Sequence, residues 1–241
     1  MKVIKKMAEK AKDLGREGVT LAFLGDSVTQ GCFEIYSKGN EAILTVFDKR
    51  YSYEMMVLEI FNMLYPTVTI NIINAGIAGD RAPNGLKRLE RDVIRHEPDL
   101  TVVCYGLNDS KDPGDSVGKY VTALEEIFQK LMDAGSEIIY MTPNMMNTHI
   151  SPCVTDPLQI SVAERCAEVQ NTGVLAAHLE AGKALCKKCG IPVCDCYAIW
   201  KMLSENGVDT TELLSNKINH PTREMNKLFA IELVRTMFYA E

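Results

Sequence analysis

The chain has 241 residues, of which 46% are hydrophobic and 24% are charged, and its formal net charge is −6 at pH 7. These proportions are typical of a globular domain and exclude an intrinsically disordered chain, which has fewer apolar residues and a larger net charge. The acidic balance argues against nucleic acid as a partner and against a negatively charged membrane surface, because both need a basic face.

The sequence also bears on location. No run of about 18 apolar residues occurs, so we expect no membrane span. The first residues, MKVIKKMAEKAKDLG, lack the continuous apolar core of a secretory signal. Their apolar residues recur at helical spacing, which predicts an amphipathic helix within residues 1–18, packed on the domain formed by the rest of the chain. Without an export signal we expect a cytoplasmic protein whose eight cysteines stay reduced.

Five short runs rich in β-branched residues alternate with longer segments of helical periodicity. The expected strands are 19–24, 68–73, 100–105, 137–141 and 191–194, and the expected helices are 51–65, 82–96, 116–134, 170–189 and 222–239. The strand segments are continuously apolar, as in strands that are covered on both faces. This alternation predicts a single-domain α/β protein with three layers, α/β/α, around a five-stranded parallel sheet.

Two connections, 31–50 and 143–160, are long, and long loops within compact domains are usually functional. In open α/β sheets, ligands bind beyond the carboxyl ends of the strands. The segments that follow the first three strands or precede the last helix are GDSVTQG (25–31), NAGIAGD (74–80), GLND (106–109) and NHP (219–221). Each alone also fits a turn or a helix cap, but four at one sheet edge indicate a site.

These segments contain the groups needed to cleave an ester. A serine hydroxyl such as that of Ser27 needs a base within hydrogen-bond reach, and His220 is the candidate base. The negative oxygen that forms when a carbonyl is attacked needs donors aimed at it. The backbone N–H of Ser27, the backbone N–H of Gly76 and the side-chain amide of Asn108 are the candidates for this oxyanion hole.

The four segments together resemble the SGNH hydrolases, the family of GDSL-type lipases and esterases. The resemblance extends over essentially the whole chain, with the segments in the family's order. It implies a flavodoxin-like fold, Ser27 as the nucleophile and His220 as the base. Gly76 and Asn108 would complete the oxyanion hole. No metal or organic cofactor is implied.

One position departs from the family pattern. The family commonly has an aspartate three residues before the histidine, where it orients the imidazole, and this chain has Lys217 there. A lysine cannot accept a hydrogen bond from an imidazole N–H. We therefore expect Lys217 to point to solvent, and the ring to be held by a backbone carbonyl near residues 215–216 or by the side-chain oxygen of Asn216. The site would then be a Ser-His dyad.

Cysteines 186, 189, 194 and 196 are spaced closely enough to raise the possibility of a zinc site. The alternative, which we favour, is that they are small buried apolar residues.

Several substrates remain open. We expect a small-molecule ester with a short acyl chain, and favour O-deacetylation of a carbohydrate or another small polar ester. A lysophospholipase or an acyl thioesterase of the same family is the first alternative. A non-catalytic small-molecule-binding α/β module is the second, and Lys217 is its main support. The sequence does not predict the oligomeric state.

Overall fold

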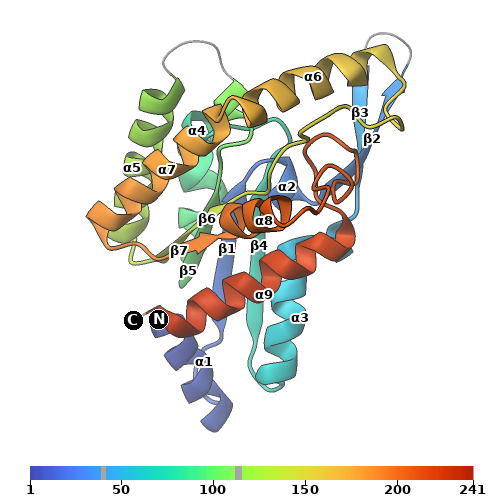
Figure 1. Ribbon diagram of the computed structural model, residues 1–241. Coiled ribbons are helices and arrows are strands. Elements are labelled where there is room, and N and C mark those ends of the chain that lie inside the picture. Colours follow the sequence, from blue (N-terminus) through green and yellow to red (C-terminus); the bar gives the residue numbers. More distant parts are fainter. Residues whose placement is uncertain (39–41, 112–115, 241) are drawn as a thin grey trace.

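A parallel sheet forms the centre of the protein. The computed structural model describes residues 1–38, 42–111 and 116–240. Five strands, in the order β4-β1-β5-β6-β7, run parallel to one another (Figure 1). They are β1 (Val19–Gly25), β4 (Ile70–Gly76), β5 (Leu100–Cys104), β6 (Glu137–Thr142) and β7 (Val193–Asp195). Counted along the chain within this sheet, the order is 2-1-3-4-5, that of flavodoxin-like folds. The expected α/β fold is confirmed.

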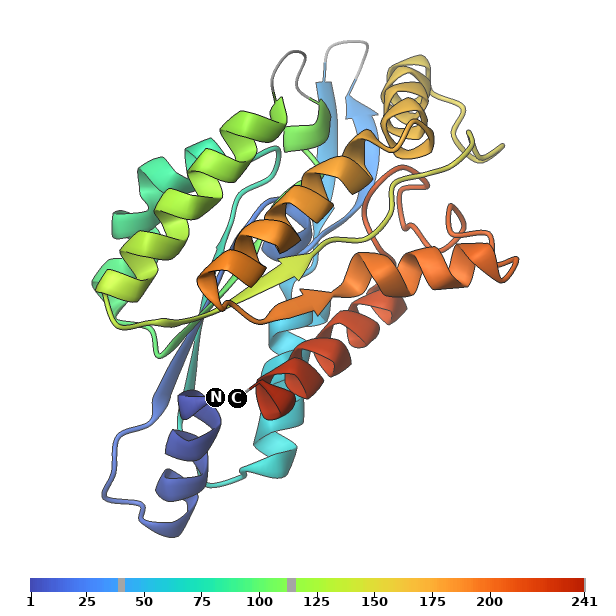
Figure 2. The same ribbon diagram turned by 60° about the vertical axis from the view of Figure 1, so that its left-hand side comes forward.

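Helices cover both faces of this sheet, as Figures 1 and 2 show. On one face lie α4 (Ala82–Asp92), α5 (Ser116–Asp133) and α7 (Val174–Cys189), and on the other lie α1 (Lys2–Lys12), α3 (Tyr53–Leu64), α8 (Cys196–Glu205) and α9 (Arg223–Tyr239). Short 3-10 turns are η1 (Lys49–Tyr51), η2 (Ile94–His96) and η3 (Asp109–Lys111). Each face has its own apolar core, and burial of each large side chain such as Phe128 or Trp200 stabilises the fold by roughly 1.5–3 kcal/mol.

The amino-terminal helix α1 packs on this core through Val3 and Met7, as expected. The carboxylate of Glu137 accepts the backbone N–H groups of Lys2 at 2.8 Å and Val3 at 2.7 Å, so a residue of β6 caps this helix. The two chain ends lie side by side in Figure 2, and the amino group of Met1 donates to the carbonyl of Ala240 at 2.8 Å.

The two connections expected to be loops contain regular structure. Residues 32–47 form an antiparallel hairpin of β2 (Cys32–Lys38) and β3 (Ala42–Phe47), with 39–41 outside the described residues. Its strands are only partly buried, with Tyr36 and Phe47 about half exposed. The strand β3 is a continuous apolar run, AILTVF, whereas β2 mixes apolar residues with Glu34, Ser37 and Lys38. A helix, α6 (Pro157–Asn171), follows residues 143–156. Asp156 caps its first turn, because the Asp156 carboxylate accepts the N–H of Leu158 at 3.0 Å.

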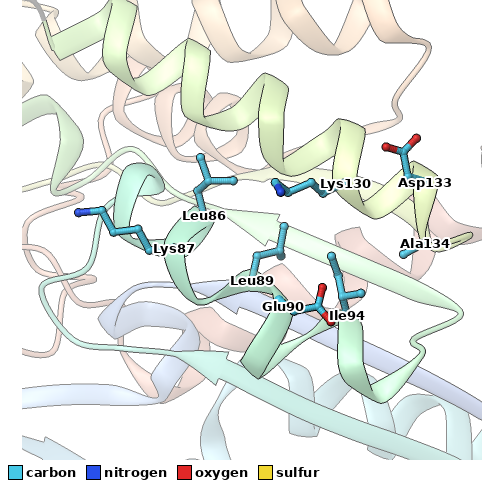
Figure 3. A pocket seen from close by; sticks show the side chains of 8 residues that line it. All are labelled: Leu86, Lys87, Leu89, Glu90, Ile94, Lys130, Asp133 and Ala134. Carbon is cyan, nitrogen blue, oxygen red and sulfur yellow. The ribbon is translucent and has the colours of Figure 1, made fainter.

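The amino ends of the strands, opposite the predicted site, also border a cavity. A cavity of about 420 Å³ lies between α4 and α5, lined by residues such as Leu86, Lys130 and Ala134 (Figure 3). It is near the amino ends of the strands and contains none of the predicted site residues. Within the described ranges we find no helix that is both long and apolar enough to cross a lipid bilayer.

Candidate active site

Ser27 lies where β1 ends, at the carboxyl edge of the sheet, and begins the one-turn helix α2 (Ser27–Gln30). The carboxylate of Asp26 caps this turn by accepting the N–H of Val28 at 3.0 Å. Gly25 allows β1 to pack closely against β5 here, since a Cβ atom there would lie 2.7 Å from the carbonyl oxygen of Cys104. The serine is thereby held between β1 and β5, where the strand order reverses and ligands bind in folds of this type.

His220 is brought to Ser27 from the loop before α9. The side-chain oxygen of Asn216 accepts the backbone N–H groups of Ile218 at 3.0 Å, Asn219 at 2.9 Å and His220 at 3.0 Å, which folds this loop into a compact turn. Nε2 of His220 lies 3.0 Å from Oγ of Ser27. The two side chains are 193 residues apart in the sequence, and both are buried.

The imidazole is oriented by a backbone carbonyl that the sequence does not point to. Nδ1 of His220 lies 2.9 Å from the carbonyl oxygen of Phe33, at the beginning of the β2–β3 hairpin. A carbonyl oxygen only accepts, so Nδ1 carries the proton and Nε2 is free to accept the proton of Ser27. The prediction that Asn216, or the backbone near it, would hold the ring is therefore wrong, because the oxygen of Asn216 is bound to the backbone of its own loop.

Lys217 points away from the imidazole. Its ammonium group donates to the carbonyl oxygen of Glu212 at 2.8 Å and pairs with the Glu212 carboxylate at 2.9 Å. Its backbone has a φ of 57°, and its side chain is 23% exposed. The lysine thus stabilises the loop at its outer side and is only partly directed to solvent.

Burial lowers the pKa of His220 to about 4 from its ordinary 6.5. The hydrogen bond to the Phe33 carbonyl opposes this shift, the positive charge of Lys111 adds to it, and the negative charge of Glu34 opposes it. The ring is therefore neutral at physiological pH. That is the state required of a base that takes a proton from serine.

The predicted role of Gly76 in the oxyanion hole does not fit its surroundings. Its N–H donates to the side-chain oxygen of Asn74 at 3.0 Å. A Cβ at this glycine would lie 2.3 Å from the backbone nitrogen of Gln30 and 2.7 Å from the carbonyl carbon of Thr29. Gly76 therefore allows β4 to pack against α2, and its N–H is already used.

Gly79, three residues further along the same segment, fits the role better. Its φ is 78°, and its N–H meets no acceptor among residues 1–38, 42–111 and 116–240. With Asn108 it lines a cavity of about 340 Å³, whose other walls come from Arg81, Lys111, Ser161, Val162 and Arg165. Glycine adopts positive φ readily, so the second glycine of this segment, Gly79 before Asp80, was a sequence signal for a left-handed turn.

Asn108 is held firmly at the same edge. Its amide nitrogen donates to the carbonyl of Asp80 at 2.9 Å and lies 3.4 Å from Oδ2 of Asp26. One amide hydrogen is thus well bound and the other only weakly, so the second can donate to a substrate oxygen.

Burial raises the pKa of Asp26 to about 7, against the opposing effect of the Val28 N–H.

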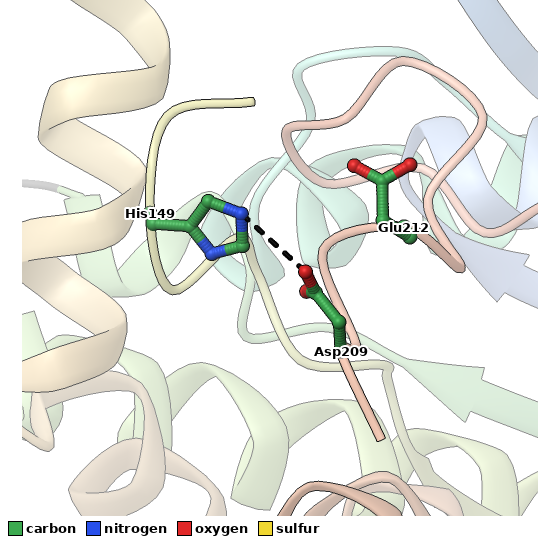
Figure 4. A group of neighbouring side chains, drawn as sticks. All are labelled: His149, Asp209 and Glu212. Atoms are coloured by element: carbon green, nitrogen blue, oxygen red, sulfur yellow. Dashed lines mark ion pairs between the residues drawn. The ribbon is translucent and has the colours of Figure 1, made fainter. Parts of the chain in front are cut away.

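A group of three side chains in the described parts of the chain has ligand atoms within 4.8 Å of one another: His149, Asp209 and Glu212 (Figure 4). Nε2 of His149 lies 3.5 Å from Asp209. The two oxygens of Glu212 are bound to Lys217 at 2.9 Å and to Ser151 at 3.1 Å. Because an ammonium group already neutralises this carboxylate, the cluster acts as a polar link between residues 143–156 and the loop that carries His220.

The four cysteines that lie close together in the sequence, 186, 189, 194 and 196, do not meet at one point in the structure. Cys186 packs in the core beneath α5 and α7, whereas Cys194 and Cys196 belong to the core on the opposite face of the sheet. Cys194 and Cys196 lie close together, with their sulfur atoms 3.7 Å apart. A sheet between the two pairs separates the ligands that a shared zinc ion would need.

Comparisons with known proteins identify the family of this chain. Residues 23–228 match the model of the GDSL-like lipase/acylhydrolase family. An acetylxylan esterase from Geobacillus stearothermophilus is 27% identical over 135 residues, a segment that covers 52% of this chain and 60% of that enzyme.

Two solved structures share the fold. A crystal structure of an acetylxylan esterase from Geobacillus stearothermophilus has a TM-score of 0.68 at 20% identity, covering 92% of this chain and 95% of that one. A two-domain esterase active on acetylated mannans has a TM-score of 0.67 at 19% identity, covering 99% of this chain and 53% of that one. The family match extends from β1, which leads to Ser27, into α9, which follows His220. The chain therefore belongs to the GDSL-like lipase/acylhydrolase family, as the four sequence segments predict.

Proposed function

We propose that the protein is a carboxylic ester hydrolase that works through an acyl-enzyme on Ser27. The observation that supports this most is the 3.0 Å contact between Ser27 Oγ and Nε2 of a neutral His220 whose Nδ1 proton is bound to a carbonyl. This arrangement supplies an activated hydroxyl and the tautomer that can receive its proton.

The reaction proceeds in two halves. In the first, Ser27 attacks the ester carbonyl, His220 takes the hydroxyl proton, and the imidazolium then gives that proton to the departing alcohol. In the second, water attacks the acyl-enzyme while His220 takes a proton from it. The imidazolium then returns that proton to Oγ of Ser27 as the bond between Oγ and the acyl carbon breaks and the acid leaves. We assign the negative oxygen of each tetrahedral intermediate to the N–H groups of Ser27 and Gly79 and to the amide of Asn108.

We further propose a short acyl group on a polar alcohol, such as an acetylated carbohydrate. The cavity next to Gly79 and Asn108 supports this, because Arg81, Lys111 and Arg165 contribute to its walls. Charged and hydroxyl-bearing walls suit the hydroxyl groups of a sugar and are unfavourable for a long acyl chain. The relatives named for acetylated xylan and mannan support the same class.

A fluorophosphonate probe tests the reaction class. We expect it to label the wild type, and to leave Ser27→Ala unlabelled while still labelling Ser136→Ala. Ser136 is a matched control because it is a buried serine beside the start of β6, where it contacts Thr101 at 3.0 Å. An unlabelled wild type would instead favour a non-catalytic binding module.

Acyl preference tests the substrate class. We expect kcat/KM for nitrophenyl esters to be highest for acetate, and acetylated xylo-oligosaccharides to release acetate. A maximum at octanoate would contradict the short-chain proposal and favour a lysophospholipase or thioesterase.

A further inference from the structure

The carbonyl that orients His220 lies at an irregular point of the β2–β3 hairpin. The two strands pair at Cys32 and again from Ile35, while the two intervening residues, Phe33 and Glu34, face a single residue of β3. Such a bulge leaves backbone groups out of the ladder and turns the strand. The Phe33 carbonyl released in this way accepts the Nδ1 proton of His220 at 2.9 Å.

Arg223 holds both bulge residues from the first position of α9. Its guanidinium carbon lies 4.3 Å from the centre of the Phe33 ring. Its two terminal nitrogens bind the two carboxylate oxygens of Glu34 at 2.5 and 3.1 Å, and its Nε lies 3.5 Å from Asp48. Stacking on a ring combined with a two-point carboxylate contact is geometry that arginine provides and lysine does not.

The same arginine is only three residues beyond His220. One side chain therefore connects the loop that carries the base to the hairpin that carries the acceptor for that base. The side chains of Arg223 and Glu34 are only partly exposed, at 27% and 43%. Glu34 is one of the bulge residues that the β2–β3 ladder leaves unpaired.

We propose that Arg223 is a positioning residue for the Ser27–His220 pair. It holds in place the Phe33 carbonyl, which orients the imidazole as an aspartate commonly does in this family. This inference rests on the proposed ester hydrolysis for its kinetic consequence, but not for the ring geometry it predicts. A neutral carbonyl has no charge to draw the ring toward it, so its position must be set by the backbone that carries it.

Loss of this support has a defined effect on the imidazole. If the carbonyl moves, the ring loses the bond that keeps the proton on Nδ1, and the tautomer with the proton on Nε2 becomes populated. That tautomer cannot accept the proton of Ser27. A displacement of about 1 Å in a catalytic group lowers the rate by about 10²-fold, so we expect kcat to fall by about 10- to 100-fold.

Arg223→Met tests the proposal, and Arg235→Met is its matched control. Arg235 lies on the same helix, pairs with Glu232 and has its guanidinium carbon 5.9 Å from the Tyr239 ring. With nitrophenyl acetate, we expect Arg223→Met to lower kcat with little change in KM, Arg223→Lys to recover part of the loss, and Arg235→Met to behave as wild type. Glu34→Gln should lower kcat as well, and combining it with Arg223→Met should add little, because both act through one contact.

Nitrogen-15 spectra of histidine-labelled protein provide a readout that does not depend on activity. We expect His220, identified among the four histidines by the His220→Gln spectrum, to be the Nδ1-protonated tautomer in the wild type and a mixture in Arg223→Met. A pure Nδ1 tautomer with unchanged kcat in Arg223→Met would overturn the proposal. If Arg223→Met does not fold, Glu34→Gln and Arg223→Lys decide by the same spectra. If the wild type is not labelled by the fluorophosphonate probe and hydrolyses no ester, the proposed function fails, but the tautomer measurement still tests the role of Arg223.

Discussion

The acidity of His220 makes a measurable prediction about the pH dependence of ester hydrolysis. Because kcat/KM reports the free enzyme, its acid limb follows the protonation of the base, and only the neutral ring can accept the proton of Ser27. Burial places the pKa of His220 at about 4. We therefore expect kcat/KM to stay high from pH 7 to about 5 and to reach half of its maximum near pH 4.

The size of this shift follows from the structure. Moving the pKa from 6.5 to about 4 corresponds to roughly 3 kcal/mol of unfavourable free energy for charging the ring in its buried position. This net cost already includes the Phe33 carbonyl and the negative charge of Glu34, which reduce it, and the positive charge of Lys111, which increases it. Removing the lysine charge should therefore raise the pKa of His220.

The assay is acetate release measured from pH 3 to pH 8 in a pH-stat or by product quantification, with wild type, Lys111→Gln and Lys130→Gln. Lys130 lies at the opposite edge of the sheet, beside the cavity of Figure 3, and its variant should leave the profile unchanged. We expect the acid limb of Lys111→Gln to move to higher pH. A wild-type limb at or above pH 6.5, or a Lys111→Gln limb that moves to lower pH, would refute the assignment of a buried, neutral base.

Three other variants test separate parts of the site. Asn108→Ala should lower kcat by about 10²- to 10³-fold with little change in KM, as loss of an oxyanion donor does. Lys217→Met should leave kcat near the wild-type value and reduce stability by about 1 kcal/mol or less, since it removes only the contact with Glu212. Asp26→Asn should stabilise the fold above pH 7 by up to about 4 kcal/mol and have little effect near pH 4, measured by denaturant unfolding at both pH values.

The sign of the last prediction follows from the direction of the pKa shift. The folded protein holds a proton on Asp26 up to about pH 7, whereas the unfolded chain releases it near 3.8. Between these values the folded state binds more protons, so stability falls as the pH rises through this window. An amide is never ionised and escapes this loss. Equal stability changes for Asp26→Asn at pH 4 and pH 8 would contradict the raised pKa.

The central sheet could be predicted from the sequence because its strands are predominantly apolar, and β1, β5 and β6 are almost entirely buried. The segments expected at 100–105 and 137–141 differ from β5 and β6 by a single residue at one end. The hairpin was not predicted, because β2 mixes apolar and polar residues and offers no partner run for β3, although β3 itself, AILTVF, is as apolar as the central strands. Helix α8 was missed because it begins directly after β7, where Asp195 caps it by accepting the N–H of Ala198 at 3.2 Å.

The site was predictable only where side chains carry the chemistry. The candidates Ser27 and Asn108 follow from residue type and from their position after strands, and His220 follows from residue type and from its position before the last helix. The choice between Gly76 and Gly79 depends on which N–H is already bonded, and two glycines of one segment look alike until the φ angle and the Asn74 contact are known.

The Phe33 carbonyl, which accepts the Nδ1 proton of His220, could not be predicted from the sequence. Every residue has a backbone carbonyl, so the residue type of Phe33 carries no information about this role; the bulge and the pairing of Arg223 with Glu34 do. A carboxylate in that place would both orient the imidazole and stabilise its positive form, whereas a carbonyl does the first and contributes less to the second. In this chain the Phe33 carbonyl orients the ring, and the neighbouring Glu34, whose carboxylate is paired with Arg223, makes the smaller contribution to the pKa of His220.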